Sequence, residues 1–277
     1  MKRILEILRR FLIFSFLTLL TQVGGVIYLL NIFTYKFIDA RFEKRIYRIG
    51  LRVASFLVAY SIATFLIVPL LAKPFGRVPL PFFETKDLQP LNVWTCLLNR
   101  HYVKPELKEI AFSVAEEMNK KFPGTTINYL DANFPFINEF PLLPHLSHDD
   151  GKKLDLAFCY RDRARGKETN EAPSFIGYGI CEAPLPGEEN SPEACAQKGH
   201  WQYSFLQRFV PQGSKEDFLF DAQRTKALAS LFASHPEIGK IFIEPHLKTR
   251  LQLTSEKICF HGCGAVRHDD HIHVQLR

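Results

Sequence analysis

The sequence predicts an α+β protein in which a two-helix transmembrane hairpin precedes a folded domain of strands and helices. Two long apolar runs lie near the N-terminus, and most of the excess positive charge lies in the same region. The rest of the 277 residues alternates between strand-like and helix-like patterns. We therefore expect an anchor over residues 1–73, a linker over 74–95 and a folded domain over 96–277.

The two apolar runs, residues 11–35 and 53–72, contain no charged side chain. Each is long enough to cross a hydrocarbon layer of about 30 Å as a helix. The alternative for the first run is a cleaved signal peptide, but the apolar part of such a peptide is normally only about 7–15 residues long. We therefore expect both helices to be retained in the lipid bilayer, with Gly24 and Gly25 allowing close helix contact.

The charge of the chain is unevenly distributed. Residues 1–73 carry eleven basic and three acidic side chains, whereas the remainder carries 24 basic and 26 acidic ones. The net charge of +6 therefore belongs to the anchor and does not describe a surface that binds nucleic acid. Six basic residues lie between the two runs and four precede the first, so the positive-inside rule predicts a cytoplasmic connecting segment with both termini outside.

The cysteines indicate the same side of the membrane for the domain. All six follow the second apolar run, and an even number suits an oxidising compartment with up to three disulfides. The alternatives are reduced, buried thiols in a domain that faces the cytoplasm, or a metal clip at the C-x3-C pair Cys259 and Cys263. We expect the protein in the inner (cytoplasmic) membrane, with its domain in the periplasm or another extracytoplasmic space.

Proline, apolar periodicity and alternation divide the region after the anchor. Four prolines mark residues 74–95 as a linker, and the domain is expected to start near Val93. The period of apolar residues predicts helices over 106–122 and 218–235, each followed by proline. Strand-like patterns occur over residues 125–130, 153–160, 240–244 and 271–276. Residues 161–191 are rich in glycine, proline and charge and are expected to form a long excursion beside a binding cleft.

Histidines are concentrated in two motifs of the domain, HLSHDDGKKLD at residues 145–155 and HDDHIH at residues 268–273. A hydrolytic zinc site needs three nitrogen or oxygen ligands and one open position. His148, Asp155 and His273 can supply these three ligands. A single histidine is more often structural, but metal binding explains why so many lie together at the ends of strands.

Other residues of the two motifs suit supporting roles. Strand alternation places His271 on the same face as His273, so we expect it to act as the general base. His268 and His145 are candidates to orient groups or to stabilise a developing oxyanion. Glu244, at the end of a predicted strand, is a possible further acid or base. Four aspartates are expected to lie around the ligands or in solvent, namely Asp149, Asp150, Asp269 and Asp270.

The two motifs resemble those of the LAS zinc metallopeptidases, which include lysostaphin-type and D-alanyl-D-alanine metallopeptidases and share H-x6-D followed by H-x-H. The closer resemblance is to the penicillin-insensitive murein endopeptidases. Their H-x2-H-x2-G-x3-D pattern is matched by His145, His148, Gly151 and Asp155, and their H-x2-H-x-H pattern by His268, His271 and His273. The segment IGKIFIEPHLKTRL is also similar to the sequence before their second motif, so the resemblance covers about residues 140–277.

The resemblance implies a small antiparallel sheet with flanking helices and one Zn2+ ion held by His148, Asp155 and His273. It also implies hydrolysis of peptide cross-links of peptidoglycan outside the cytoplasm. Two features depart from the family. The anchor replaces the cleavable signal of the soluble enzymes, and Lys152 and Lys153 place positive charge beside the metal loop, where they either alter the substrate or are simply solvated.

The resulting hypothesis is a membrane-anchored zinc peptidase, like a murein endopeptidase, whose partners are peptidoglycan peptides and the lipid bilayer, with no nucleic acid. One alternative is a D,D- or L,D-carboxypeptidase of cell-wall peptides, which a cleft closed at one end by residues 161–200 would favour. Another is a non-catalytic cell-wall-binding membrane protein. The intact set of candidate ligands argues against this non-catalytic alternative.

Overall fold

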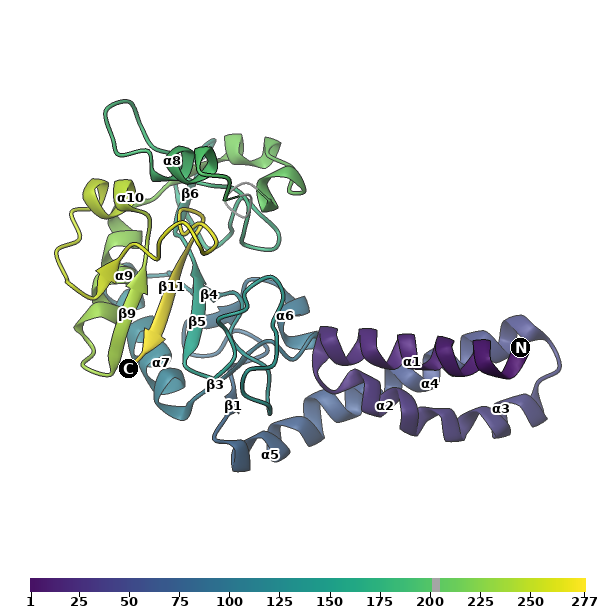
Figure 1. Ribbon diagram of the computed structural model, residues 1–277. Coiled ribbons are helices and arrows are strands. Elements are labelled where there is room, and N and C mark those ends of the chain that lie inside the picture. The colour runs from purple at the N-terminus through teal and green to yellow at the C-terminus, as the bar shows by residue number, and fades with distance from the viewer. Residues whose placement is uncertain (201–204) are drawn as a thin grey trace.

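The computed structural model describes residues 1–200 and 205–277, and the protein is α+β, as predicted. A helical arm formed by residues 2–75 projects from a domain of small sheets and short helices (Figure 1). The arm contains α1 (Lys2–Thr21), α2 (Gly24–Asn31), α3 (Tyr35–Arg41), α4 (Arg45–Ile62) and α5 (Val68–Ala72). Single 3-10 or π turns join α2 to α3 and α4 to α5, so the arm consists of three antiparallel helical segments (Figure 1).

The arm differs from the two-helix hairpin that the sequence predicted. The apolar run 11–35 is not one helix, because the chain reverses at Gln22, where φ is 64°, and continues as α2 beside α1. The two legs pack closely at Gly25, where a Cβ atom would clash with the Thr18 hydroxyl and the Phe14 carbonyl. Among the described residues, one helix, Arg45–Phe75, is long and apolar enough to cross a membrane.

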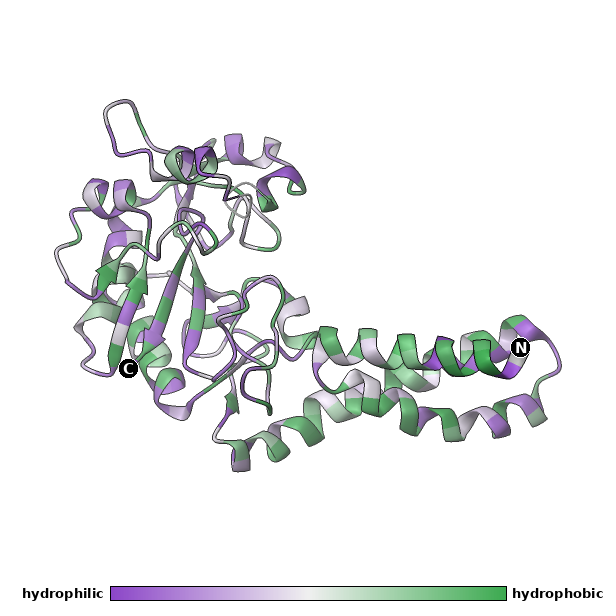
Figure 2. Ribbon diagram, viewed as in Figure 1, coloured by the Kyte–Doolittle hydropathy of each residue, from purple (hydrophilic) through white to green (hydrophobic). Residues whose placement is uncertain are grey.

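The extra turn also changes where the N-terminus lies. The N-terminus lies at the tip of the arm farthest from the domain, at the same end as the segment between α3 and α4 (Figure 1). The prediction that both termini lie outside assumed one helix over residues 11–35, and the turn at Gln22 removes that assumption. Hydrophilic residues gather toward this tip, while the part of the arm nearer the domain is mostly apolar (Figure 2).

Residues 74–95, expected to form a linker, instead pack into the domain. β1 (Val78–Pro79) pairs with β3 (Tyr102–Val103), and β2 (Leu88–Pro90) joins the main sheet at its edge. Arg77, Leu80 and Leu88 are buried. The prolines that suggested a linker are compatible with this arrangement because two of them occupy short or edge strands, where a missing N–H donor is tolerated.

The main sheet has six strands in the order β10-β9-β11-β5-β4-β2. The strands not yet introduced are β10 (Ile258–Cys259), β9 (Ile238–Phe242), β11 (His271–Leu276), β5 (Lys153–Ala157) and β4 (Ile127–Tyr129). β11 lies antiparallel between β9 and β5, as the expected antiparallel sheet requires, but β10 with β9 and β2 with β4 form parallel pairs. The sheet is therefore mixed at its two edges.

One face of the sheet forms the core, and the other carries the polar site. Leu154, Leu156, Ile272 and Val274 belong to one buried apolar cluster with α7 (Pro105–Lys121) and α9 (Ala222–Ser234). Because side chains alternate along a strand, Asp155, His271 and His273 face the opposite side. The two long helices pack on the apolar face of the sheet. The other face of the sheet is therefore free to carry polar residues.

The helix predicted over 106–122 is confirmed as α7, whereas the one predicted over 218–235 starts later. Asp221 caps α9 by accepting a hydrogen bond from the Arg224 N–H, so the helix begins at residue 222. The preceding residues form β8 (Phe218–Phe220), which pairs with β6 (Tyr160–Asp162), and β6 also pairs with β7 (Glu168–Thr169). The short helices of the domain are α6 (Val93–Leu97), α8 (Ser191–Gln197) and α10 (Pro245–Arg250).

Candidate metal centre

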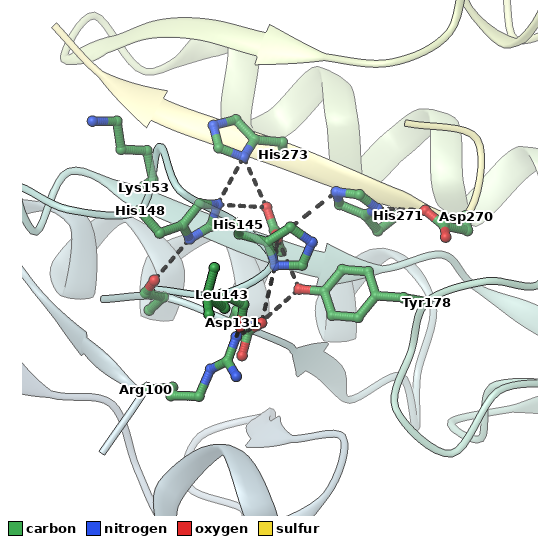
Figure 3. A network of polar contacts seen from close by, with 12 residues as sticks. Arg100, Asp131, Leu143, His145, His148, Lys153, Tyr178, Asp270, His271 and His273 are labelled. Atoms are coloured by element: carbon green, nitrogen blue, oxygen red, sulfur yellow. Dashed lines mark hydrogen bonds and ion pairs between the residues drawn. The ribbon is translucent and has the colours of Figure 1, made fainter. Parts of the chain in front are cut away.

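Two adjacent strands and one loop bring His148, Asp155 and His273 together. Asp155 on β5 lies directly opposite His273 on β11, and His148 comes from the turn just before β5. One ligand atom from each of the three buried residues lies within 4.8 Å of the others. His273 Nδ1 is 2.8 Å and His148 Nε2 is 3.3 Å from Asp155 Oδ1, so the three groups converge and can hold a metal ion (Figure 3).

Neighbouring groups orient two of these ligands. His148 donates from Nδ1 to the Ala132 carbonyl at 2.7 Å, which leaves the lone pair on Nε2 for a metal. The Tyr178 hydroxyl donates to Asp155 Oδ2 at 2.8 Å. When a ligand side chain is also hydrogen-bonded to a neighbouring group, as His148 and Asp155 are, that bond fixes the orientation of the ligand and tunes its basicity.

The protonation states in this cluster suit metal binding. Burial raises the pKa of Asp155, but His148 and His271 outweigh that effect and hold it well below its usual value. Burial lowers the pKa of His273 to about 4, against an opposing effect of Asp155. A carboxylate and a neutral imidazole are the forms that bind a cation.

His271 lies beside the three candidate ligands and does not converge with them. Its Nδ1 donates to Asp270 at 2.5 Å, while Nε2 is buried without a hydrogen-bond partner and lies 3.7 Å from Asp155 Oδ2. Burial lowers its pKa, but Asp155 and Asp270 outweigh that effect and raise it to about 9. With a pKa of about 9, the His271 side chain is a charged imidazolium at neutral pH.

His145 occupies a similar position on the other side of Tyr178. Its Nδ1 is 3.0 Å from Asp131 Oδ2, its Nε2 is buried without a partner, and its ring lies 4.5 Å from that of Tyr178. Asp131 is in turn held by Arg100 at 2.6 Å. Burial raises the pKa of Asp131, but Arg100 and His145 outweigh burial and lower it.

Sequence reasoning missed Asp131, Tyr178 and Arg100. Asp131 directly follows the predicted strand 125–130, so its place at a strand end was an available signal. Tyr178 lies in the irregular excursion and Arg100 in a turn after α6, and neither has a pattern that points to the site. These residues are found only through the fold.

His268 lines the site through its ring, whereas Glu244 lies behind it. The His268 ring lies 5.0 Å from that of His271, and its pKa is lowered well below the usual value by burial and by His271. Glu244 accepts hydrogen bonds from the His268 N–H at 3.2 Å and from Ser191 at 2.9 Å. Burial and the charge of Asp269 raise the pKa of Glu244 to about 7.

Three of the remaining aspartates of the two motifs form ion pairs with basic residues in or next to the motifs. Lys153 pairs with Asp149 and Asp150, and the Asp269 carboxylate is paired with Arg267. Lys153 is therefore not a solvated loop residue, whereas Lys152 has an exposed amine that donates to the Arg277 carbonyl. Asp270 acts through His271, as described above.

A cavity of about 450 Å³ opens over the candidate ligands. One wall is the arm-side loop, residues 134–149, which contributes His145, Leu146 and His148. Another part of the lining is the disulfide loop, residues 260–267, which contributes His261 and Val266 and is joined to α8 by Cys195–Cys263. The other four cysteines, all in the part of the chain that the structure describes, are unpaired, so one disulfide forms where up to three were expected.

Comparisons with known proteins give no family for this chain. Neither a scan against protein-family models nor a search of the curated proteins finds a match. Functional interpretation therefore depends on the geometry of the site and on the motifs described above.

Proposed function

We propose that the protein is a membrane-anchored, zinc-dependent peptidase that hydrolyses peptide cross-links of peptidoglycan. The observation that carries the proposal is the convergence of His148, Asp155 and His273 at the floor of a cavity. Two further imidazoles, His145 and His271, have unpartnered Nε2 atoms beside it. Two histidines, one carboxylate and an open side are the donor set expected for a hydrolytic zinc site.

In the proposed mechanism the three ligands would hold one Zn2+ ion. A bound zinc ion supplies Lewis-acid activation of a water molecule and of the scissile carbonyl at neutral pH. Tyr178 and the Ala132 carbonyl keep Asp155 and His148 in the orientation that binding requires.

His271 is proposed to move the proton. Because Nδ1 is engaged by Asp270, the exchangeable position is Nε2. Asp155 is one of the two charges that raise the pKa of His271 to about 9. A cation held by Asp155 would offset that charge and lower this pKa, which would favour Nε2 as the proton acceptor. His145, held by Asp131, and His268 are proposed to stabilise the developing oxyanion.

The arm supports a location in the inner membrane with the domain outside the cytoplasm. Both the N-terminal tail and the segment between α3 and α4 lie at the tip of the arm, so the basic residues of both are on the same side (Figures 1 and 2). The tail charges therefore reinforce the positive-inside argument for a cytoplasmic tip. A disulfide in the domain suits an oxidising space on the other side.

The test is metal content and digestion of purified cell-wall sacculi by the full-length protein in detergent. A fragment that begins at the expected domain boundary, residue 96, is unsuitable because it lacks the buried residues Arg77 and Leu80. We expect about one zinc per chain and soluble peptide products in the parent, loss of both in His148→Ala, and no change in His235→Ala, which removes a histidine outside the site. A folded parent that binds no metal would overturn the proposal.

A carboxypeptidase is a second candidate because the excursion borders the site. The Tyr178 ring packs against both His145 and His271, so this segment limits one side of the reacting groups. The two activities release different products. An endopeptidase separates cross-linked dimers into monomers, whereas a carboxypeptidase releases a single terminal amino acid.

A further inference from the structure

We infer that the helical arm is also part of the site, because it positions the arm-side loop that supplies His148. Two side chains from the arm and its exit, Gln22 and Arg77, hold that loop. The inference rests on the proposed metal site, since the ligand whose position it concerns is His148.

Arg77 is the first contact. It follows the last turn of the arm directly, with its N–H bonded to the Ala72 carbonyl at 3.2 Å, and it is fully buried. Its guanidinium donates to the Phe134 carbonyl, to the Asn138 side chain at 2.5 Å and to the Asp149 carbonyl at 3.0 Å. These acceptors lie at both ends of the arm-side loop, so one side chain closes the loop on which His145 and His148 sit.

The space around Arg77 is restricted on the side of the metal motif. A Cβ atom at Gly151 would lie 3.2 Å from Arg77 Nε, and Gly151 has φ of 83°, a backbone conformation that favours glycine. Gly151 therefore serves two purposes, the turn into β5 and the close approach of the guanidinium. The glycine of the first motif is thus explained by its positive φ in the turn together with the contact with Arg77.

Gln22 is the second contact, and it comes from the turn between α1 and α2. Its Oε1 accepts from the Phe136 N–H at 2.8 Å, and the side chain is almost fully buried. Phe136 packs on the apolar cluster formed by Val23, Ile27, Val68, Ala72 and Tyr102. Its ring also lies 5.2 Å from that of Phe75 in an edge-to-face arrangement. The turn that the sequence failed to predict therefore docks against the loop.

Together these contacts give the arm a role beyond tethering. The arm-side loop has no regular secondary structure, so its position depends on side-chain contacts from elsewhere. Arg77 holds the loop at Phe134, Asn138 and Asp149. Gln22 holds it at Phe136 and Ile137. A change in the packing of α1, α2 and α5 is expected to reach His148 by this route.

The test is a titration of the full-length protein in detergent with Co2+, read by its visible absorption and by thermal unfolding. We expect Arg77→Met to raise the Co2+ dissociation constant about tenfold or more, as is typical when a group that positions a ligand is lost. Gln22→Ala removes the side-chain hydrogen bonds to Phe136 and Ile137, of which the bond from the Phe136 N–H is the shortest, and is expected to raise the Co2+ dissociation constant about fivefold. Loop motion is followed by amide hydrogen exchange over residues 134–149.

Two control variants separate positioning from general destabilisation. Arg224 is as buried as Arg77 and also binds backbone carbonyls, but it holds β6, β7 and Asp221 and does not touch the arm-side loop. Arg224→Met is expected to lower thermal stability at least as much, with little change in Co2+ affinity. Asn31→Ala loosens the contact of α2 with the Arg52 carbonyl within the arm and is expected to leave Co2+ affinity unchanged.

The outcomes distinguish this inference from the proposed function. If the Arg77 and Arg224 variants weaken Co2+ binding equally, or if neither variant weakens it, the arm does not position the loop. If Arg77→Met fails to fold, Gln22→Ala and Asn138→Ala, which removes a side-chain acceptor of Arg77, decide the question. If the parent binds no Co2+, the proposed function fails, and exchange rates over residues 134–149 still test the coupling to the arm.

Discussion

The two loops that line the cavity, the arm-side loop and the disulfide loop, are held in different ways. The arm-side loop supplies His148 and is fixed by hydrogen bonds from Arg77 and Gln22. The disulfide loop supplies none of the three candidate ligands and is fixed by the covalent bond between Cys195 and Cys263. The loop that carries the ligand thus depends on the arm, and the disulfide loop depends on the redox state of its surroundings.

This difference has an energetic consequence. A hydrogen bond contributes only about 1 kcal/mol on balance, so the arm-side loop can be displaced by changes in its neighbours. A disulfide that closes a loop of 68 residues stabilises the fold by about 4 kcal/mol, by restricting the unfolded chain. We therefore expect metal binding to respond to changes at the first loop and global stability to changes at the second.

The largest expected effect comes from removing one histidine from each loop. His148→Ala deletes a candidate ligand and is expected to weaken Zn2+ binding by more than about 100-fold, beyond what loss of a supporting residue costs. His261→Ala, in the lining of the same cavity, is expected to change it less than about threefold. Isothermal titration of the two variants measures both effects. Equal losses of Zn2+ affinity in the two variants would mean that both loops contribute equally to metal binding, which would contradict the prediction.

The second prediction concerns the disulfide. Cys195→Ser is expected to lower the free energy of unfolding by about 4 kcal/mol while leaving Zn2+ affinity within about threefold of the parent. Cys259→Ser, which removes an unpaired cysteine near the same loop, is the control and is expected to have little effect on either quantity. Denaturant unfolding with and without a reductant measures this. A stability that does not respond to the reductant would contradict the prediction.

The third prediction concerns Glu244, which accepts a hydrogen bond from the His268 N–H just after the disulfide loop. Its pKa is about 7 in the folded protein and near 4.5 in the unfolded chain, so the native state favours the protonated form. Deprotonation therefore destabilises the fold as pH rises from 4.5 to 7, and the full cost remains above pH 7. Glu244→Gln imitates the protonated side chain and is expected to be more stable than the parent by about 3 kcal/mol at pH 8.

At pH 4 the same variant and the parent are expected to have similar stability, because Glu244 is then protonated in both the folded and the unfolded states. Thermal unfolding at pH 4 and pH 8 measures the difference. A Glu244→Gln effect that is equal at the two pH values would show that Glu244 does not titrate in this range.

Two of the three candidate ligands, Asp155 and His273, could be predicted from sequence because they lie on regular strands. Alternation in HIHVQL placed His271 and His273 on one face, and the structure aligns His273 with Asp155 across the β11 and β5 pair. The spacing of the first motif correctly brought His148 to the same point. A strand has a period of two, so it fixes which side chains share a face even without knowledge of the partner strand.

The arm and its junction with the domain could not be predicted, because apolar content does not show where the chain reverses its direction. Both legs of the α1 and α2 hairpin are apolar, so the run 11–35 reads as one helix although the chain reverses at Gln22. Proline content likewise suggested a linker at residues 74–95, yet edge strands accept proline. Contacts such as those of Arg77 join residues more than 55 positions apart, and no local pattern records them.

The smallest expected effect concerns Tyr178, which contacts both the ligand set and Asp131, three residues before the arm-side loop. Its hydroxyl donates to Asp155 Oδ2 and accepts from the Asp131 N–H at 3.1 Å. Tyr178→Phe is expected to raise the Zn2+ dissociation constant about tenfold, because Asp155 loses the hydrogen bond that orients it.

Tyr102→Phe is the matched control, since its buried hydroxyl has no hydrogen-bond partner, and it is expected to leave Zn2+ affinity unchanged and stability equal or slightly higher. If Tyr178→Phe binds Zn2+ as tightly as Tyr102→Phe does, then Asp155 is oriented by its strand alone. The excursion would in that case serve only to pack against the rings of His145 and His271. The dependence of the site on flanking segments would then be confined to the arm-side loop.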